Sequence, residues 1–267
     1  MGSVCVFVNQ KGGVGKTTSA INIGAFLADA GKSVLLVDFD AQANLSSGIG
    51  ADTPKPGIYD LLSGEAAVEQ VTRKTAVKNL DVIPADKDLS GATVELIDQK
   101  ERNFFLKKAL APIKTKYDFI LIDCPPSLGQ LTMNGLAAAD SIFIPMQCEY
   151  FAMEGLIQLL ETTKEVQKSL NPSIIIGGIF FTMYDPRTRL ANDVIKQVSA
   201  HYKKMVFNTI IPRNIRLSEA PSFRMPISLY DPQCPGARAY QALAQEILRR
   251  TIINASHSAE SGEKNGA

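Results

Sequence analysis

The sequence predicts an α/β fold in which a mostly parallel, twisted sheet is wrapped by helices. Short apolar runs, which suit strands buried on both faces, alternate along the chain with amphipathic runs of helical period. In folds of this class, ligands bind at the carboxyl ends of the strands. The predicted strands are residues 4–9, 33–38, 80–84, 118–123, 141–146 and 173–182, and the clearest predicted helices are 17–31 and 150–170.

Length and composition indicate a globular protein with a sizeable core. The chain has 267 residues, 45% of them hydrophobic, and a formal net charge of +1, which suits one large domain or two small ones. We expect a single domain over residues 1–252, followed by a polar tail at 253–267 whose small residues favour disorder. Residues 46–57, rich in glycine, serine and proline, are expected to form an exposed loop.

The sequence shows no features of a membrane or secreted protein. No apolar run reaches the roughly 18 to 20 residues needed to cross a bilayer, and the N-terminus leads into a predicted strand without the layout of a signal peptide. The cysteines form no C-x-x-C pair and the chain has only two histidines, so neither a zinc site nor a disulfide framework is indicated. We therefore expect a cytoplasmic protein with structural cysteines at Cys5, Cys124, Cys148 and Cys234.

The segment between the first predicted strand and helix, NQKGGVGKTTS at residues 9–19, predicts a phosphate-binding loop. Its glycines leave successive backbone N–H groups free to converge on phosphate oxygens. Lys16 is expected to contact the β- and γ-phosphates, and Thr17 is expected to bind Mg²⁺ through its hydroxyl group. The N-terminus of the following helix would direct its positive dipole end toward the same phosphates.

The loop departs from the common pattern G-x-x-x-x-G-K-[ST] at its first position, where Gln10 stands in place of glycine. It carries an additional lysine, Lys11, beside Gly12. This second cation requires an explanation, because the pattern already supplies Lys16. A solvated surface lysine is the simplest alternative to a functional one.

Aspartates end two predicted strands that lead toward this loop. The run FILIDCPP closes on Asp123, where phosphate-loop enzymes keep a carboxylate that holds Mg²⁺, usually through water. The run LLVDFDAQ closes on Asp38 and Asp40, and their spacing of two predicts that both face the same side of an extended segment. An isolated aspartate at a strand end is often merely exposed, but three that converge on one glycine-rich loop indicate function.

Together, five segments resemble the ParA/Soj family of partition ATPases, within the deviant-Walker group that also includes MinD and the nitrogenase iron protein. The resemblance extends from the N-terminus to about Arg250. The loop with the additional lysine is typical of the whole group, and the last three segments are typical of the chromosomal ParA/Soj branch. The resemblance implies a Rossmann-like, deviant phosphate-loop fold and Mg²⁺-dependent hydrolysis of ATP. The segments are KGGVGKTT (11–18), VDFDAQAN (37–44), IDCPPSLG (122–129), PMQCEYFAMEG (145–155) and IPRNIRLSEAPSF (211–223).

The resemblance assigns a role to the additional lysine. In that family, a lysine at the position of Lys11 reaches across a nucleotide-sandwich dimer to the phosphates held by the other subunit, and Gly12 stays small because the two loops approach closely. A cation supplied in trans makes the two loops attract each other only when nucleotide is bound. Glu149 matches a position that in relatives contacts the partner's nucleotide ribose, although an ordinary exposed glutamate fits the sequence equally well.

The remaining site residues also follow from the resemblance. Asp40 would position or activate the attacking water, Thr17 and Asp123 would serve Mg²⁺, and Asp38 would support the Mg²⁺ ligands without touching the ion. The implied catalytic residues are Lys11, Lys16 and Asp40, and the implied ATP-binding residues are Lys11, Gly12, Gly13, Val14, Gly15, Lys16, Thr17, Thr18 and, beside the adenine, Pro212 and Asn214.

Basic residues in the second half of the chain suggest a surface for nucleic acid. Arg187 and Arg216 match positions that bind DNA non-specifically in chromosomal ParA relatives, so we expect them to contact phosphates rather than bases. Scattered, solvated arginines are the alternative interpretation. Further candidates are Arg189, Lys203, Lys204, Arg213 and Arg224.

These inferences predict an ATP-switched homodimer that binds nucleoid DNA when ATP and Mg²⁺ are present. A ParB/Spo0J-like centromere-binding protein, implied by the resemblance, would stimulate hydrolysis and release the dimer, and the cycle would segregate a chromosome or a plasmid. A related ATPase that positions another cargo remains an alternative, because sequence separates the two poorly. A MinD-like membrane ATPase is less favoured, since EILRRTIIN gives way to a polar tail. An electron-transfer iron protein is disfavoured by the positions of the cysteines.

Overall fold

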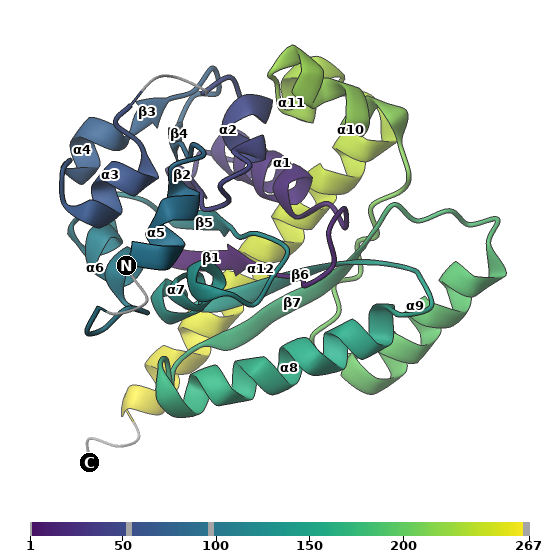
Figure 1. The fold of residues 1–267 in the computed structure, drawn as a ribbon. Coiled ribbons are helices and arrows are strands. Elements are labelled where there is room, and N and C mark those ends of the chain that lie inside the picture. Colours follow the sequence, from purple (N-terminus) through teal and green to yellow (C-terminus); the bar gives the residue numbers. More distant parts are fainter. Residues whose placement is uncertain (1, 52–54, 96–98, 264–267) are drawn as a thin grey trace.

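The computed structural model describes residues 2–51, 55–95 and 99–263, and the described strands form one sheet of seven strands (Figure 1). The strand order is β3-β4-β2-β5-β1-β6-β7, and each neighbouring pair is parallel except β3 with β4. The predicted fold class is therefore confirmed. The strands are β1 (Ser3–Phe7), β2 (Val34–Asp38), β3 (Arg73–Lys74), β4 (Leu80–Ile83), β5 (Phe119–Asp123), β6 (Ser141–Gln147) and β7 (Ile175–Thr182).

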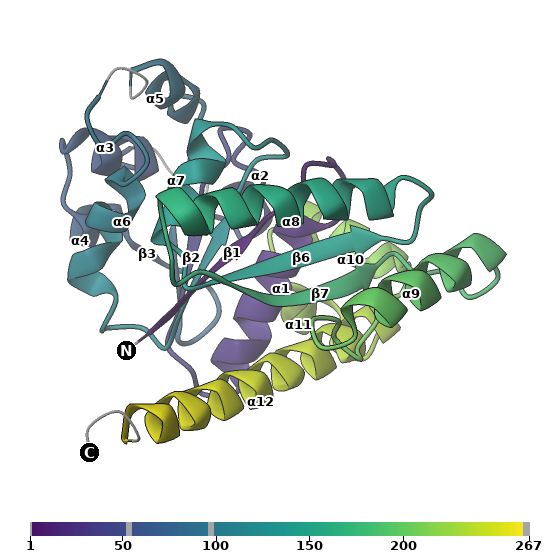
Figure 2. The ribbon, with the colours of Figure 1, turned by 90° about the horizontal axis from the view of Figure 1, so that it is seen from below.

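Helices connect the strands and cover both faces of the sheet. They are α1 (Lys16–Asp29), α2 (Asn44–Gly48), α3 (Ile58–Ser63), α4 (Val68–Val71), α5 (Leu89–Glu95), α6 (Phe105–Leu110), η1 (Ala111–Ile113), α7 (Gln130–Ala138), α8 (Ala152–Ser169), α9 (Arg189–Tyr202), α10 (Ile215–Glu219), η2 (Ala220–Phe223), α11 (Ile227–Tyr230) and α12 (Pro235–Glu263). α1 and α12 pack together on one face, whereas α6, α7 and α8 cover the other (Figure 2).

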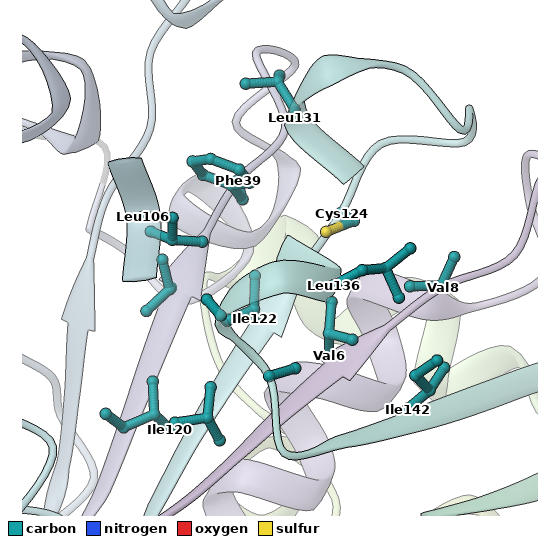
Figure 3. Packing of buried hydrophobic residues seen from close by; sticks show 14 of the residues in the cluster. Val6, Val8, Phe39, Leu106, Ile120, Ile122, Cys124, Leu131, Leu136 and Ile142 are labelled. Atoms are coloured by element: carbon teal, nitrogen blue, oxygen red, sulfur yellow. The ribbon is translucent and has the colours of Figure 1, made fainter. Parts of the chain in front are cut away.

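The central strands are apolar on both faces, which is why the sequence shows them as continuous apolar runs. On one face, Val6, Ile122 and Ile142 belong to the same buried cluster as Leu106 of α6 and Leu136 of α7 (Figure 3). A second buried cluster joins the opposite face of the sheet to α1 and α12. The sheet is thus fixed by packing from two sides.

The strand register aligns the carboxyl ends of β1, β2 and β5. Phe7 lies opposite Asp123 in the β1–β5 pair, and Asp38 lies opposite Asp123 in the β2–β5 pair. The segments that follow these strands therefore begin at one edge of the sheet. They are the segments in which the sequence predicts the phosphate loop and the three aspartates.

Two segments differ from the expectation. The exposed loop expected at residues 46–57 begins inside α2, and Ser46, Ile49 and Ala51 are buried, because Asp38 holds Ser46 against the sheet. The tail expected to be disordered continues α12 as far as Glu263; its segment up to residue 261 contains no helix breaker, so an established helix can propagate through it. Residues 52–54 and 264–267 lie outside the described residues, and the domain boundary stays a prediction.

Candidate nucleotide-binding site

The loop between β1 and α1 forms one wall of a cavity of about 580 Å³. Gly13 and Gly15 adopt left-handed backbone conformations, with φ of 73° and 85°, which glycine adopts without the strain that a side chain would add. Val14 between them is buried, so its side chain anchors the loop in the protein. The cavity is lined by six residues of the expected ATP-binding set, namely Gly12, Gly13, Gly15, Lys16, Thr17 and Thr18.

Lys16 is held inside this loop. Its Nζ donates hydrogen bonds to the carbonyl oxygens of Asn9, at 3.1 Å, and Lys11, at 3.2 Å. Burial lowers the pKa of its ammonium group, and the negative charge of nearby Asp123 opposes that shift. The ammonium group therefore lies in the loop beside the cavity that its glycines surround. Among the described residues its hydrogen bonds go to neutral carbonyl groups, which phosphate oxygens can replace.

Asp123 ends β5 behind the loop, and its surroundings are unusual for a carboxylate. It is 1% exposed, and among the described residues neither of its side-chain oxygens has a hydrogen-bond partner. Burial, with a further contribution from Asp38, raises its pKa to about 8. The nearby Thr17 hydroxyl group, which is too poorly placed here for a hydrogen bond of normal geometry, and the charge of Lys16 act in the opposite direction. Buried polar atoms are nearly always paired, so these two oxygens indicate a missing partner.

Mg²⁺ with its water shell fits this position. Mg²⁺ prefers oxygen ligands, keeps several waters, and is commonly held by one or two protein groups together with phosphate oxygens. Asp123 supplies unpaired oxygens, and Thr17 lines the cavity with a hydroxyl group near them. Within the described part of the chain, no group of three His, Cys, Asp or Glu side chains is placed to hold a metal alone.

Asp38 lies beside Asp123 in the sheet. The spacing of Asp38 and Asp40 predicted that both face the same side, but only Asp40 of the two lines the cavity. Asp38 is fully buried, and its Oδ2 accepts hydrogen bonds from the backbone N–H of Ser46, at 2.8 Å, and from the Ser46 hydroxyl, at 2.6 Å. Burial raises its pKa to about 6, although these hydrogen bonds lower it in part. Asp38 therefore fixes the segment that follows β2.

Ser46 is a structural partner of the site that sequence reasoning missed. Its Oγ donates to Asp38 and also accepts a hydrogen bond from the backbone N–H of Ala85, at 2.9 Å. One hydroxyl group thus joins the ends of β2 and β4. The sequence offered no signal for this role, because Ser46 lies in a segment whose composition is typical of a loop.

Asp40 follows the end of β2 and lines the cavity. Its backbone N–H donates to Asp38 Oδ1 at 3.3 Å, and its Oδ1 accepts from the backbone N–H of Gln42 at 3.0 Å. The turn then passes through Ala43, whose φ of 52° is rare for a residue with a side chain. Asp40 is therefore fixed at the rim of the cavity by backbone contacts on both sides.

A second cavity, of about 310 Å³, lies next to the first and shares Gly15, Thr18, Met183 and Pro221 with it. Pro212 and Asn214, the residues expected beside the adenine, both line it. The Asn214 side chain caps α10 by accepting the N–H of Arg216 at 3.1 Å. The structure thus brings these two residues to the mouth of the loop, although they follow it in the sequence by about two hundred positions.

Lys11, like the buried Val14, does not line the cavity of about 580 Å³. Its ammonium group forms an ion pair with Glu149, and both side chains are about half exposed. Two strongly exposed aromatic residues, Tyr150 and Phe151, come next in the chain and contact each other edge to face. The two residues expected to act across a dimer therefore pair within one protomer.

Arg187 and Arg216 lie on adjacent segments at the same end of the molecule. Tyr184, just before Arg187, exchanges backbone hydrogen bonds with Ile211 and Arg213, just before Arg216. Both arginines have carboxylate partners. Arg187 binds Asp185, with Nη2 to Oδ2 at 2.6 Å, and Arg216 binds Glu219 at 2.9 Å and Asp231 at 3.4 Å.

The four cysteines are free thiols, three of them buried and Cys148 partly so. None of the helices that the structure describes is both long and apolar enough to cross a bilayer.

Comparisons with known proteins identify the family. The family model described as "AAA domain" matches residues 2–176. The chain is 64% identical over 250 residues to the chromosome-partitioning ATPase Soj of Treponema pallidum, covering 94% of this chain and 98% of that protein. It is 49% identical over 252 residues to the chromosome partitioning protein ParA of Myxococcus xanthus, covering 94% of this chain and 89% of that protein.

A solved structure shares the fold over nearly the whole chain. It is the cobyrinic acid a,c-diamide synthase of Mycobacterium smegmatis with bound ADP and magnesium, at a TM-score of 0.83 and 36% identity, covering 94% of this chain and 96% of that one. The extent of these matches, and the level of identity to the two partitioning proteins, lead to one conclusion. The chain belongs to the ParA/Soj family of chromosome-partitioning ATPases.

Proposed function

We propose that this protein hydrolyses ATP in order to bind and release DNA during partitioning. ATP and Mg²⁺ close a homodimer, the dimer binds nucleoid DNA without sequence preference, and hydrolysis stimulated by a ParB/Spo0J-like protein releases it. The observation that carries the nucleotide chemistry is the unpaired, buried carboxyl group of Asp123 behind a glycine loop with Lys16 and Thr17. The solved relative that binds ADP and magnesium supports the same reading.

The side chains divide the chemistry among themselves. Lys16 and the loop N–H groups bind phosphate oxygens, and Asp123 with Thr17 holds the metal. Mg²⁺, when bound, neutralises charge on the phosphates. Asp40 orients the attacking water from the rim of the cavity, and Asp38 supports it through its contact with the Asp40 N–H. Pro212 and Asn214 contact the base from the second cavity.

Dimer closure is assigned to Lys11. Its ammonium group lies outside the cavity of its own protomer, half exposed, where it can reach phosphates held by a second protomer. Glu149 then contacts the ribose of the partner's nucleotide. Because the loops attract each other only through bound ATP, the dimer depends on the nucleotide.

The resemblance to chromosomal relatives assigns DNA binding to Arg187 and Arg216, which two copies of the chain would present together when the dimer closes. Contacts to phosphates explain binding without sequence preference, because phosphates carry no sequence information. The protein is then cytoplasmic and associated with the nucleoid. The cargo is a chromosome or a plasmid; another cargo positioned by a similar ATPase is the alternative.

The test is binding to a random-sequence DNA duplex without nucleotide, with ADP, and with ATP plus Mg²⁺, over a series of salt concentrations. Wild type is compared with Asp40→Ala, which should lose about 100-fold or more of the hydrolysis rate but keep ATP-dependent binding. Arg216→Ala should weaken binding and lower the salt slope by about one per lost phosphate contact. Arg249→Ala is the matched control, since Arg249 is an exposed arginine in the middle of α12.

Two outcomes would overturn the proposal. Asp40→Ala that hydrolyses ATP at the parental rate, with DNA and partner present, contradicts the role of Asp40. Absence of ATP-dependent DNA binding in every variant contradicts the nucleoid role, and binding to vesicles of anionic lipid would then favour a MinD-like membrane ATPase.

A further inference from the structure

The back of the phosphate loop is contacted by the last residues of two neighbouring strands. Gln147 ends β6, and its Nε2 donates a hydrogen bond to the carbonyl oxygen of Gly13 at 3.2 Å. Thr182 ends β7, and its Oγ1 donates to the carbonyl oxygen of Val14 at 2.8 Å. These contacts join residues that are 134 and 168 positions apart in the sequence.

These two bonds determine where the loop N–H groups point. A peptide unit is planar and trans, so its C=O and its N–H point in opposite directions. Because the carbonyl of Gly13 faces Gln147, the N–H of Val14 faces away from Gln147. Because the carbonyl of Val14 faces Thr182, the N–H of Gly15 faces away from Thr182. In the part of the chain that the structure describes, no acceptor is recorded for either N–H.

Met183 helps to fix the Gln147 amide. The same Nε2 of Gln147 lies 2.9 Å from the Met183 sulfur, so both of its hydrogens have an acceptor. Met183 follows Thr182 in a left-handed conformation with φ of 52°, which is rare for a residue with a long side chain. Its Cε lies 3.7 Å from the position that a Cβ on Gly15 would take. Strained backbone of this kind often accompanies functional sites.

We propose that Gln147 and Thr182 are positioning residues for the phosphate loop. They hold the carbonyl groups of Gly13 and Val14 against the ends of β6 and β7, and this directs the N–H groups of Val14 and Gly15 toward the β-phosphate of the nucleotide. Gln147 lines neither the first nor the second cavity; Thr182 also lines the second one, but its hydrogen bond to the loop does not depend on that position. The inference rests on the proposed ATP site, and it adds two residues outside the glycine loop to the machinery that binds phosphate.

The experiment measures binding of ADP and AMP to four variants that form two matched pairs, and to a fifth variant, Thr182→Ser. Thr182→Val removes the hydroxyl donor at nearly constant volume, and Thr163→Val removes an equivalent buried hydroxyl that donates to the Leu159 carbonyl in α8, at 2.8 Å. Gln147→Met removes the amide donor, and Gln167→Met removes an amide that donates to the Ile174 carbonyl, at 2.8 Å.

ADP should bind about tenfold more weakly to Thr182→Val and to Gln147→Met, because a charge-assisted hydrogen bond loses its alignment. AMP lacks the β-phosphate, so its affinity should change by less than about twofold. Thr182→Ser keeps the donor and should restore ADP binding. Both control variants should bind ADP as wild type does. A purely structural role would instead weaken ADP and AMP binding equally.

The possible results separate this inference from the proposed function. Wild-type protein that binds neither ADP nor ATP overturns the proposed function itself. Wild-type binding that survives unchanged in Thr182→Val and Gln147→Met overturns only the positioning role. If thermal melting shows that Thr182→Val does not fold, Gln147→Met decides the question, because Gln147 is only partly buried and its loss leaves the core intact.

Discussion

Asp123 is a carboxyl group kept inside the protein without a partner from the chain. Its two oxygens are buried beside Asp38, and burial alone already favours the protonated form. A buried polar group without a hydrogen bond destabilises the folded state. The nucleotide-free protein therefore carries a local instability at the place where Mg²⁺ is expected to bind.

The stability of the nucleotide-free protein should depend on this residue and on pH. In the unfolded chain Asp123 has an ordinary pKa and loses its proton near pH 4. In the folded protein its pKa is raised, so it keeps its proton up to about pH 8. The free energy of unfolding should therefore fall as pH rises through this window. Asp123→Asn should raise it by about 1–3 kcal/mol at pH 8 and flatten its pH dependence.

Denaturant unfolding between pH 5 and pH 8, without nucleotide or Mg²⁺, measures both effects. Asp81→Asn is the control, because Asp81 is also buried but accepts hydrogen bonds from Lys74 and Tyr117. That substitution should not stabilise the protein. An Asp123→Asn protein that is no more stable than wild type at pH 8 would show that the carboxyl group has a partner in solution. Asp38, whose pKa is raised in the same direction, should leave some residual slope.

The sequence revealed those site residues that a short motif contains. Lys16, Thr17 and the loop glycines stand together, and Asp123 ends an apolar run that any buried strand would show. Ser46, Gln147 and Thr182 could not be found in this way, because each acts through a hydrogen bond to a residue far along the chain or inside a segment of loop-like composition. Such contacts depend on strand order, which no local pattern specifies.

Among the secondary-structure elements, α1 packs tightly against the sheet at Gly24. A Cβ at this position would lie 2.7 Å from Leu36 Cδ2 and 3.4 Å from Leu121 Cδ1, and both leucines are fully buried. Gly155 in α8 offers the opposite case, since nothing lies within 4 Å of a Cβ there. The two glycines share a helical setting but differ in the space around them.

Alanine should therefore have opposite effects at these two glycines. Gly24→Ala should destabilise the protein by about 1–3 kcal/mol, because overpacking exceeds the gain in helix propensity. Gly155→Ala should stabilise it by up to about 1 kcal/mol, because only the propensity changes. Chemical denaturation of both variants under one condition gives the comparison. A stabilised Gly24→Ala would mean that α1 can move away from β2 at little cost.

Elements were predictable to the extent that their burial produced a pattern. The strands β1, β2, β4, β5, β6 and β7 are apolar over most of their length, and the sequence located each of them. β3 consists of Arg73 and Lys74 alone, and two charged residues at a sheet edge form no pattern. α2 was missed because its five residues are too few to show a helical period, and its place is set by the contact between Asp38 and Ser46.

At the scale of the whole molecule, the ion pair between Lys11 and Glu149 bears on whether two protomers form a dimer. It holds the additional lysine of the loop against its own protomer. Exposed ion pairs of this kind contribute only about 0–1 kcal/mol, so bound ATP on a second protomer can outcompete Glu149 for the ammonium group. The isolated protomer should therefore convert to a dimer when ATP is added.

Lys11→Ala should abolish this conversion. Light scattering is measured with ATP and Mg²⁺, at a protein concentration at least about tenfold above the dissociation constant of the Asp40→Ala dimer. Asp40→Ala, in which ATP persists, should be a dimer, and the double variant Lys11→Ala, Asp40→Ala should be a monomer. Lys116→Ala is the matched control, because Lys116 pairs with Glu69 at 2.9 Å and both are exposed. Dimers that persist without Lys11 would contradict its action in trans.

If Arg187 and Arg216 bind DNA as proposed, the carboxylates beside them should affect the ion balance of binding. Arg187 is held by Asp185, and Arg216 by Glu219 and Asp231. When the arginines exchange these partners for DNA phosphates, the three freed carboxylates should take up cations from the buffer while DNA loses its own. This uptake offsets part of the release, so log affinity should fall with log salt by less than about 0.9 per arginine contact. The surface thus carries its own counterions. Its affinity for DNA should therefore depend less on the ionic composition of the cell than the number of its arginines alone would predict.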